Sequence, residues 1–397
     1  MKIGIDITML VYTGSGVANY TYNLVKNLLE IDKFNEYRLF YSSFRRPKNF
    51  YYLNELKKLG GKIYNYRFPP TLLQLWWSRF HIIPVEWFIG KVDVFFSSDF
   101  LRPPLLNGTK GITTVHDLTW KLFPQYHEER ISKAHERKLK KTAEFNDEII
   151  VDSQSTKEDL LKLYPQINKN KVSVLYPGIG EEFRPINDKE KIKKALEKYG
   201  VKYPSNFFLY VGAIEPRKNL ELSIKVFHKL INREIATSPA ERGPRDDTSL
   251  SLRSASWRRS NPYKDWQFII AGRAGWKNES VFQLIKDLKL EDNVKFIGYV
   301  EDEDLPYLYS ACQLSVYLSS YEGFGLPPLE ALSCGAKVIV GNNSSLKETI
   351  DENYRVELNN LDTIVGKIIK ILKNKKIVFE NKFSWKTSAE KFLKVIS

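Results

Sequence analysis

The chain has 397 residues, of which 43% are hydrophobic and 27% charged, and its formal net charge at pH 7 is +14. This length allows about two domains of ordinary size, each able to bury its own core. No apolar stretch is long enough to span a bilayer, and the N-terminus runs directly into a strand pattern, so we expect a cytoplasmic protein. Cys312 and Cys334 lie in apolar segments without metal-ligand spacing, as core thiols in a reducing compartment do.

The positive charge has two open interpretations. The densest basic run, residues 130–141, spreads its charges around a predicted helix. That pattern fits a solvated surface and equally a peripheral contact with an anionic membrane at the inner face. The familiar nucleic-acid recognition motifs are missing, so we expect no nucleic-acid partner.

The first half of the chain alternates strand and helix patterns. Residues 2–7 are typical of a buried strand, and the glycine loop Thr13-Gly14-Ser15-Gly16 leads from it into a helix. Further strands are expected at residues 37–42, 62–67, 93–97, 111–115, 148–152 and 172–175. Such alternation predicts a parallel sheet covered on both faces, a Rossmann-like domain. The loop lacks the full GxGxxG spacing, so no dinucleotide cofactor is expected, although a phosphate or sugar could approach its glycines.

An aromatic run lies at residues 72–91. It contains Trp76, Trp77, Phe80, Trp87 and Phe88. An amphipathic membrane helix is one interpretation, but Pro84 interrupts it and core packing is the commoner fate of such residues. We therefore expect these side chains to be in the core.

His116 and Asp117 directly follow the strand predicted at residues 111–115. Ligands of open α/β sheets bind at the carboxyl ends of parallel strands. His116 is therefore a candidate for catalysis or binding, whereas the other four histidines fall within helical patterns and are expected to be ordinary helix residues.

A second alternation begins at residues 207–211, and its first strand leads into residues 212–219 just before a helix. Asn219 is expected to cap that helix. Arg217 and Lys218 then lie at a helix N-terminus, where two fixed cations would bind a diphosphate without a metal. Two solvated loop charges are the alternative.

The second alternation is interrupted at about residues 232–264, which are polar and lack any period. We expect a disordered surface insertion there. Further strands are predicted at residues 266–271, 294–297, 313–318 and 337–341, and an amphipathic helix at the end of the chain.

Residues 319–330 cross from a strand to a helix and carry two carboxylates, Glu322 and Glu330. A carboxylate accepts hydrogen bonds from two hydroxyls, as a ribose or hexose edge requires, while the amides of residues 323–325 favour an anion. A proline at the first helical position predicts Glu330 in the first turn. The combination suggests a sugar nucleotide. A proline-started helix with two solvated glutamates is the alternative.

Together these motifs resemble glycosyltransferase family 4, the retaining sugar-nucleotide transferases of GT-B architecture, and especially the mannosyltransferase-B-like branch. The matching segments are residues 13–16, 116–118, 176–178, 212–219, 298–300, 322–330 and 383–385. The resemblance implies an α/β fold with two Rossmann-like domains facing across a cleft. The acceptor domain would be residues 1–185 with the final helix, 384–397, crossing back to it. Residues 186–383 would bind the donor.

The same likeness assigns the site. Arg217 and Lys218 hold the donor diphosphate, Glu330 binds the ribose, and His116 contacts the hydroxyls of the transferred sugar. The other residues assigned to the donor are Glu322, Gly323, Phe324, Gly325 and Leu326 at the sugar, Gly14 and Gly16 over the phosphates, and Tyr299 and Val300. His116, Glu322, Arg217 and Lys218 are the catalytic candidates, and neither a metal nor another cofactor is expected.

The implied function is retaining, metal-independent transfer of a hexose, with mannose favoured, from a nucleotide diphosphate sugar to a glycan or lipid-linked saccharide. A sugar-nucleotide epimerase of the same architecture and a non-catalytic binding protein are the alternatives. Retention ordinarily requires a carboxylate nucleophile, for which Glu322 is the nearest candidate. Same-face substitution assisted by the leaving phosphate is equally compatible, and the base, the sugar and the acceptor stay open.

Overall fold

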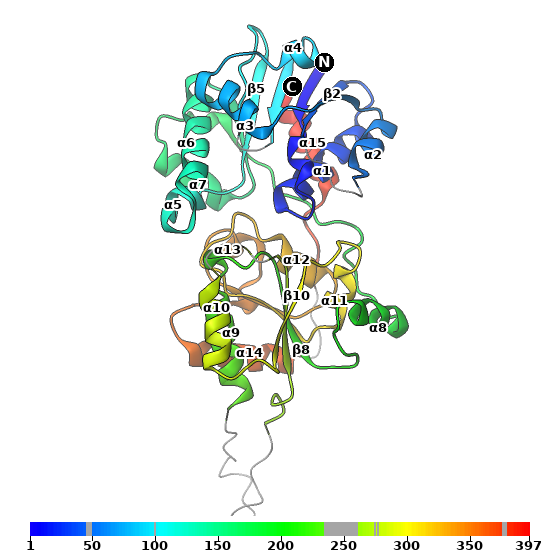
Figure 1. The fold of residues 1–397 in the computed structure, drawn as a ribbon, viewed down its shortest axis with the longest axis vertical. Helices are drawn as coiled ribbons and strands as arrows, with labels where there is room; N and C mark the ends of the chain where they lie inside the picture. Colours follow the sequence, from blue (N-terminus) through cyan, green and yellow to red (C-terminus); the bar gives the residue numbers. More distant parts are fainter. Residues whose placement is uncertain (45–49, 99–100, 234–260, 274, 276–277, 375–378) are drawn as a thin grey trace, which may run out of the picture.

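The computed structural model describes residues 1–44, 50–98, 101–233, 261–273, 275, 278–374 and 379–397. The insertion expected at about 232–264 lies almost wholly outside the described residues. The described chain forms two α/β bodies, one above the other in Figure 1, each built on a parallel sheet.

The sheet of the first body has seven strands in the order β3-β2-β1-β4-β5-β6-β7, all paired in parallel. Its strands are β1 (Lys2–Asp6), β2 (Glu36–Ser42), β3 (Lys62–Tyr66), β4 (Val94–Ser97), β5 (Lys110–Val115), β6 (Glu148–Val151) and β7 (Val172–Val174). The central strand β4 is buried along its whole length, as expected where helices cover both faces of a parallel sheet.

The sheet of the second body has six strands in the order β10-β9-β8-β11-β12-β13, also parallel. Its strands are β8 (Phe207–Val211), β9 (Gln267–Ala271), β10 (Val294–Gly298), β11 (Leu314–Tyr317), β12 (Val338–Gly341) and β13 (Arg355–Val356). The strand order reverses between β8 and β11, and in the first body between β1 and β4. Ligands of such sheets bind beside the reversal.

Helices cover both sheets, with the short non-α helices labelled η. The first body has η1 (Thr8–Val11), α1 (Gly16–Ile31), α2 (Tyr52–Lys58), α3 (Pro70–Leu73), η2 (Gln74–Phe80), α4 (Glu86–Ile89), α5 (Thr119–Leu122), η3 (Pro124–Tyr126), α6 (Glu129–Glu144), α7 (Gln154–Leu163) and η4 (Lys169–Lys171). The second has α8 (Lys189–Lys198), η5 (Pro216–Lys218), α9 (Leu220–Ile231), α10 (Glu279–Asp287), α11 (Leu305–Ala311), α12 (Leu326–Ser333), α13 (Leu346–Thr349), η7 (Glu352–Tyr354) and α14 (Leu361–Lys373). The α/β class with two Rossmann-like sheets is therefore confirmed.

The last helix, α15 (Trp385–Ile396), returns to the first body, as expected. Trp385, Ala389, Phe392 and Ile396 are buried in the core that also contains β1 and α1. A side chain at Gly178 would place its Cβ 2.1 Å from the backbone nitrogen of Trp385, so the linker requires glycine where the helix begins. Figure 1 shows this red helix beside α1 in the upper body.

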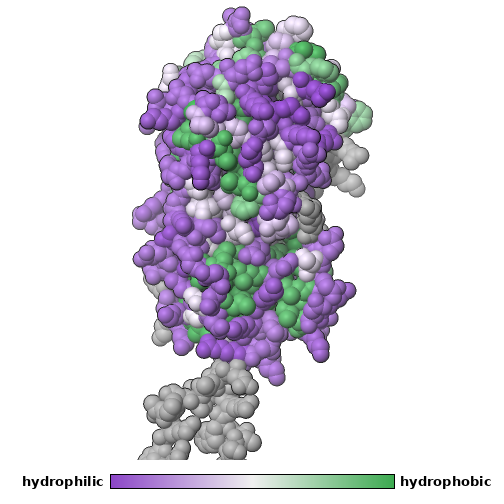
Figure 2. Space-filling model, turned by 90° about the vertical axis from the view of Figure 1, so that its left-hand side faces the viewer, coloured by the Kyte–Doolittle hydropathy of each residue, from purple (hydrophilic) through white to green (hydrophobic). Residues whose placement is uncertain are grey.

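The aromatic run is only partly in the core, so that prediction is half wrong. Trp77 is fully buried, but the side chains of Phe80 and Trp87 are 58% and 71% exposed. Figure 2 shows apolar patches set in a mostly hydrophilic surface on the face that it presents. Within the described part of the chain, no helix has the length and apolar character needed to cross a bilayer.

Candidate active site

The point of reversal in the second sheet brings two loops together. One follows β8 and carries Arg217 and Lys218 on η5, and the other follows β11 and carries Glu322. The amide of Ser320 donates to the carbonyl of Arg217 at 2.8 Å, which fixes the two loops against each other. The structure thus joins residues that are about a hundred positions apart in sequence.

Glu322 forms ion pairs with both predicted cations. The Nζ of Lys218 lies 2.8 Å from each of its carboxylate oxygens, and the Nη1 of Arg217 lies 3.2 Å from Oε2. Burial opposes ionisation of Glu322, but the charges of Lys218 and Arg217 hold the pKa of its carboxyl below the ordinary value. Glu322 is therefore an anion at the centre of a buried charged cluster.

Two further carboxylates flank Arg217. The carboxylate of Glu215 accepts from the Nε of Arg217 at 2.6 Å. The second carboxylate, Asp117, belongs to the first body, and its negative charge also stabilises the charged form of Arg217. Although burial opposes it, Arg217 holds the pKa of Asp117 below its ordinary value. Glu215 was not among the predicted site residues, although it stands two residues before Arg217 in the same loop.

Asn219 does not cap α9 with its side chain, contrary to the prediction. It adopts the left-handed conformation, with φ of 53°, and its Nδ2 donates to the carbonyl of Leu318 at 3.1 Å. Asn tolerates this conformation better than most residues. Its side chain is thus used to tie the β8 loop to the end of β11.

Glu330 lies in the second turn of α12 and not in the first. The helix begins at Leu326, because Gly325 before it has a φ of +91° that glycine adopts without strain. The hydroxyl of Tyr309 donates to Oε2 of Glu330 at 3.2 Å. Burial, with the charges of Asp302 and Glu182, raises the pKa of Glu330 to about 8.

The turn between Glu322 and α12 leaves backbone donors available. Within the described chain, the amides of Gly323, Phe324 and Gly325 donate to no protein acceptor. Phe324 is buried against the rings of Tyr176 and Phe383, which anchor the turn. Free amides before a helix favour an anion or a hydroxyl-rich ligand.

His116 lies at the carboxyl end of β5 as predicted, but both its ring nitrogens face partners within its own body. Its Nδ1 lies 2.7 Å from Oδ2 of Asp152, and its Nε2 lies 3.0 Å from the carbonyl oxygen of Ser98. Burial raises the pKa of Asp152, and the charge of His116 partly offsets that effect. Asp152 was missed, yet it directly follows β6, the neighbour of β5, so the rule of the shared sheet edge could have found it.

The glycine loop of the first body meets the second body at Tyr299. A Cβ on Gly14, whose φ is +74°, would come within 2.4 Å of the Tyr299 ring. The guanidinium of Arg273 lies 4.7 Å from the centre of the same ring. Gly16 instead starts α1, and a Cβ added to it would have no atom within 4 Å. Val300 is buried in the core of the second body.

A cavity of about 230 Å³ opens between the bodies beside this cluster. Arg217 and Glu215 line it from below. Its upper walls include His116, Asp117, Trp120, Ile131 and His135. The cavity has room for a group the size of one sugar ring next to Arg217.

The two bodies are also held together behind the cleft. The carboxylate of Glu348, on α13, accepts from the amides of Gln154 and Ser155 at 3.0 and 2.9 Å, at the start of α7. The hydroxyl of Tyr321 donates to Asp159 on the same helix at 2.6 Å. The loop that carries Glu322 is therefore tied to the first body.

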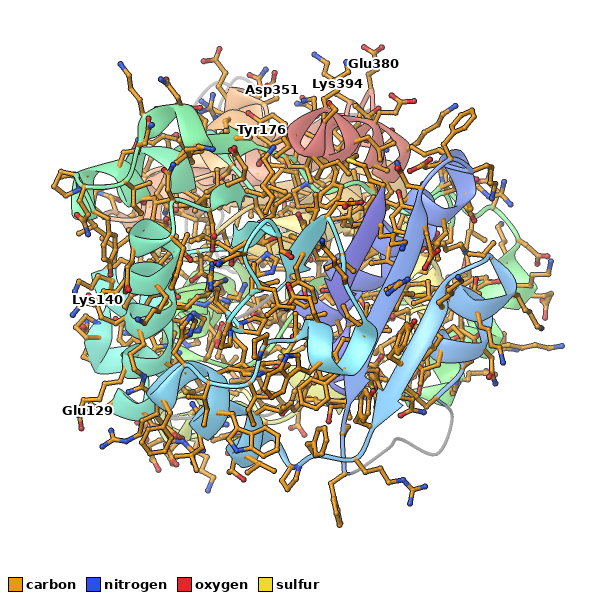
Figure 3. All side chains as sticks on the ribbon, turned by 90° about the horizontal axis from the view of Figure 1, so that it is seen from above. Glu129, Lys140, Tyr176, Asp351, Glu380 and Lys394 are labelled. Carbon is orange, nitrogen blue, oxygen red and sulfur yellow. The ribbon has the colours of Figure 1, made fainter. Side chains whose placement is uncertain are left out.

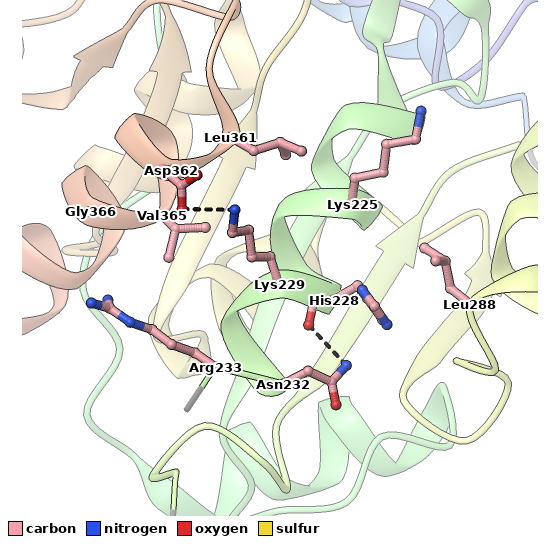
Figure 4. A pocket seen from close by; sticks show the side chains of 10 residues that line it. All are labelled: Lys225, His228, Lys229, Asn232, Arg233, Leu288, Leu361, Asp362, Val365 and Gly366. Atoms are coloured by element: carbon pink, nitrogen blue, oxygen red, sulfur yellow. Dashed lines mark hydrogen bonds and ion pairs between the residues drawn. The ribbon is translucent and has the colours of Figure 1, made fainter. Parts of the chain in front are cut away.

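A larger cavity, of about 650 Å³, lies between α9 and α14 (Figure 4). Lys225, His228 and Arg233 line it, and Lys229 pairs with Asp362 at 2.7 Å. It contains none of the predicted site residues. Over the described residues, no group of three His, Cys, Asp or Glu side chains is placed to hold a metal ion.

Comparison with known proteins identifies the family. The model of Glycosyltransferase Family 4 matches residues 14–183, and that of Glycosyl transferases group 1 matches residues 188–392. O-antigen chain mannosyltransferase B of Escherichia coli is 26% identical over 381 residues, which are 94% of this chain and 91% of that protein. The serotype-specific mannosyltransferase WbdA of E. coli is 31% identical over 249 residues, 61% of this chain and 26% of WbdA.

Solved structures share the fold. HepE of Anabaena, in complex with UDP and glucose, has a TM-score of 0.67 at 14% identity, covering 100% of this chain and 99% of HepE. WaaG, a glycosyltransferase involved in lipopolysaccharide biosynthesis, has a TM-score of 0.58 at 14% identity, covering 99% and 95%. The GT-B architecture and the family resemblance are thus confirmed. The chain belongs to the group 1 glycosyltransferases, with a family 4 domain in its first half, and is a hexosyltransferase.

Proposed function

We propose that the protein transfers mannose, with retention of configuration and without a metal, from a nucleotide diphosphate sugar to a glycan or lipid-linked saccharide. The observation that carries this proposal is the buried cluster of Arg217, Lys218 and Glu322 beside the sheet reversal, whose Arg217 lines the cavity between the bodies. The names of both relatives, which are mannosyltransferases, support mannose, and the name of the first, an O-antigen chain mannosyltransferase, supports a saccharide acceptor.

The cation pair would act on the leaving group. Negative charge grows on the departing diphosphate as its bond to the anomeric carbon breaks. Fixed cations that are already oriented in a water-poor site stabilise that charge most effectively. Arg217 is held by Glu215 and Glu322, so its guanidinium needs no rearrangement before the reaction. This arrangement supports a reaction that needs no divalent ion at the phosphates.

The environment of Glu322 supports a role as organiser of the cations. Both of its oxygens accept from Lys218, which reduces the electron density available for attack on the anomeric carbon. We therefore favour same-face substitution. The bond to the phosphate breaks while the acceptor oxygen bonds to the same face, and the proton of the acceptor hydroxyl passes to the leaving phosphate oxygen.

A product assay tests the proposal. The chain is incubated with a mannose nucleotide and a mannose-terminated saccharide, with and without EDTA, and the product is examined by mass and NMR. An α-linked product from an α-linked donor, unchanged by EDTA and lost in Arg217→Ala, is expected. Lys225→Ala, a change of an exposed cation on α9, should keep activity. An inverted linkage, a metal requirement, or an altered sugar nucleotide formed without acceptor would overturn the proposal, and the last would indicate an epimerase.

A peripheral membrane contact forms the second part of the proposal. The exposed rings of Phe80 and Trp87 lie on and after η2, and η2 is joined to the basic helix α6 by Arg137, which donates to Ser78 at 3.0 Å. Figure 3 shows Lys140 of α6 pointing away from the body. Aromatic and basic side chains on neighbouring elements fit an anionic lipid surface. We expect binding to vesicles containing phosphatidylglycerol but not to neutral ones, and binding that survives Phe80→Ser with Trp87→Ser would contradict this contact.

A further inference from the structure

His116 lies in the wall of the cavity that Arg217 also lines, but its ring nitrogens face oxygen atoms of its own body. Nδ1 lies 2.7 Å from Oδ2 of Asp152, and Nε2 lies 3.0 Å from the carbonyl oxygen of Ser98. Asp152 directly follows β6 and Ser98 directly follows β4, the two strands that pair with β5. The sheet itself therefore supplies both partners of the ring.

The two oxygens determine how many protons the ring of His116 carries. A carbonyl oxygen and an ionised carboxylate are acceptors only. A neutral imidazole has one N–H and one acceptor nitrogen, so it would set a lone pair against one of the two oxygens. A doubly protonated ring donates to both oxygens at once. The geometry therefore fits an imidazolium cation.

The proton between His116 and Asp152 belongs to the ring. The ordinary pKa of a histidine, about 6.5, exceeds that of an aspartate, about 3.9, so the ring holds this proton more tightly. Burial raises the pKa of Asp152, the charges of His116 and Lys138 oppose that effect, and the charge of Asp117 adds to it. Lys138 is itself buried and donates to the carbonyl of Thr114 at 2.5 Å. Two cations against one further anion favour an ionised Asp152.

The ring is also held through its neighbour on α1. Tyr20 packs edge-on against His116, with the ring centres 4.8 Å apart and the planes at 79°. Tyr20 in turn packs edge-on against Trp385 at 5.6 Å, where α15 begins. Edge-to-face packing of this kind fixes the tilt of a ring. The helix that returns to the first body therefore supports the position of His116.

We propose that Asp152 is a positioning residue that keeps His116 doubly protonated, so that the ring is a fixed cation in the cavity wall and not a base. The inference deepens the proposed function and rests on it for the effect on turnover. The charge of the ring itself is a property of the free protein and is measured there.

A doubly protonated His116 constrains the reaction. The ring has no lone pair with which to take the proton of the acceptor hydroxyl, in agreement with the proposed passage of that proton to the leaving phosphate oxygen. Its positive charge lies in the wall of the same cavity as Arg217, where negative charge grows on the departing diphosphate. A cation that is oriented before the reaction stabilises that charge.

Nitrogen-15 NMR on the full chain, labelled at its five histidines, measures the charge of the ring without any ligand. His116→Gln identifies the signals of His116. At about pH 8 the wild type should show two protonated ring nitrogens, and Asp152→Asn should show a neutral ring, because an uncharged amide does not hold the second proton. Asp292→Asn, the same change at an exposed position between α10 and β10, should keep the wild-type pattern. A neutral ring in the wild type overturns the proposal, whatever the variants do.

The pH profile of kcat adds a readout that a merely structural role would not move. Saturating donor removes the pH dependence expected from Glu330, so the wild-type profile should be flat from about pH 5.5 to 8. In Asp152→Asn kcat should be close to the wild type at the acid end and fall roughly 30-fold by the alkaline end, as a histidine with an ordinary pKa of about 6.5 loses its second proton. Asp152→Glu, which keeps the charge, should restore the flat profile.

The remaining outcomes separate this inference from the proposed function. A loss of kcat in Asp152→Asn that is the same at every pH would give Asp152 a structural role only and overturn the inference, while the transferase proposal stands. Absence of sugar transfer by the wild type would overturn the proposed function, and two protonated nitrogens on His116 would still support the pairing with Asp152.

Discussion

The Nζ of Lys218 lies 2.8 Å from both carboxylate oxygens of Glu322. The chain thus supplies its own anion to the cations that are proposed to hold the donor diphosphate. A buried cation cluster without an anion would be costly, because removal of one member of a buried ion pair destabilises by about 3–5 kcal/mol. While no donor is bound, the carboxylate of Glu322 is the anion that stabilises the two cations.

This relationship predicts the behaviour of Glu322→Gln. Arg217 and Lys218 lose their shared anion, so the melting temperature of the free protein should fall. Added pyrophosphate should restore it, with a larger rise than in the wild type, because a ligand that binds only the folded state stabilises it. Differential scanning fluorimetry measures the melting temperatures with and without pyrophosphate. The control is Glu197→Gln, a surface change on α8. Equal pyrophosphate shifts in the two variants would show that Glu322 does not occupy the anion site.

Glu330 predicts a pH dependence of donor binding. Its pKa in the folded protein is about 8, against an ordinary value of 4.5, so folding favours its protonated form. The stability it contributes is present below about pH 4.5 and is lost as pH rises toward 8. Ribose hydroxyls donate to the ionised form, so affinity for the sugar nucleotide should rise between pH 6 and 8, by up to about tenfold per unit. It should then level off.

The comparison for this prediction is Glu330→Gln, which has no proton to release. Its affinity should be weak and nearly flat over the same range, measured by calorimetry with an intact sugar nucleotide. Asp302 and Glu182 face Glu330, and the raised pKa of Asp302 adds to the slope in the wild type. An equally steep slope in Glu330→Gln would assign the pH dependence to Asp302 and remove the role of Glu330.

The sequence predicted the fold class because both halves repeat strands that end in glycine loops or polar side chains. Parallel strands place their carboxyl ends at one edge, so the positions of His116 and Arg217 at the sheet edges followed directly. Asp152 and Glu215 were missed only because that rule was not extended to neighbouring strands and residues.

Other features had no local signal. The left-handed conformation of Gly325, which starts α12 one residue early and moves Glu330 to the second turn, depends on how the turn packs. The exposure of Trp87 could not be told from the burial of Trp77, since both belong to one apolar run. Glu348 meets Gln154 across 194 positions, and no sequence pattern links the two.

The two glycines of the first loop should differ in tolerance. Gly14→Ala strains a residue with φ of +74° and drives its Cβ into the ring of Tyr299, so it should oppose approach of the two bodies and lower turnover. Gly16→Ala starts α1 with a better helix former, and the added Cβ has no atom within 4 Å. This variant should therefore keep activity and gain up to about 1 kcal/mol in unfolding free energy. Steady-state kinetics and denaturant unfolding measure both effects. Loss of turnover in a stable Gly16→Ala protein would instead place the donor against Gly16.

Glu348 should control how the two bodies stay together. Its carboxylate receives two amides at the start of α7 and the hydroxyl of Tyr176, which resembles a helix cap supplied by the other body. Loss of a cap costs about 1 kcal/mol, roughly a fivefold change in an equilibrium. Glu348→Ala should therefore shift the free protein toward an open form and raise KM for the donor, with a smaller effect on kcat because a bound donor favours closure.

Small-angle scattering and fluorescence transfer between labels on α6 and α10 measure that opening. Lys347→Ala is the matched control, since the neighbouring side chain is exposed and its carbonyl, not its ammonium group, is used to hold Arg355. Glu348→Gln keeps an acceptor for one amide and should fall between the wild type and Glu348→Ala. If Glu348→Ala leaves both the distance between the labels and KM unchanged, Tyr321 and Asp159 hold the bodies together without it, and the double variant with Asp159→Asn should then open them.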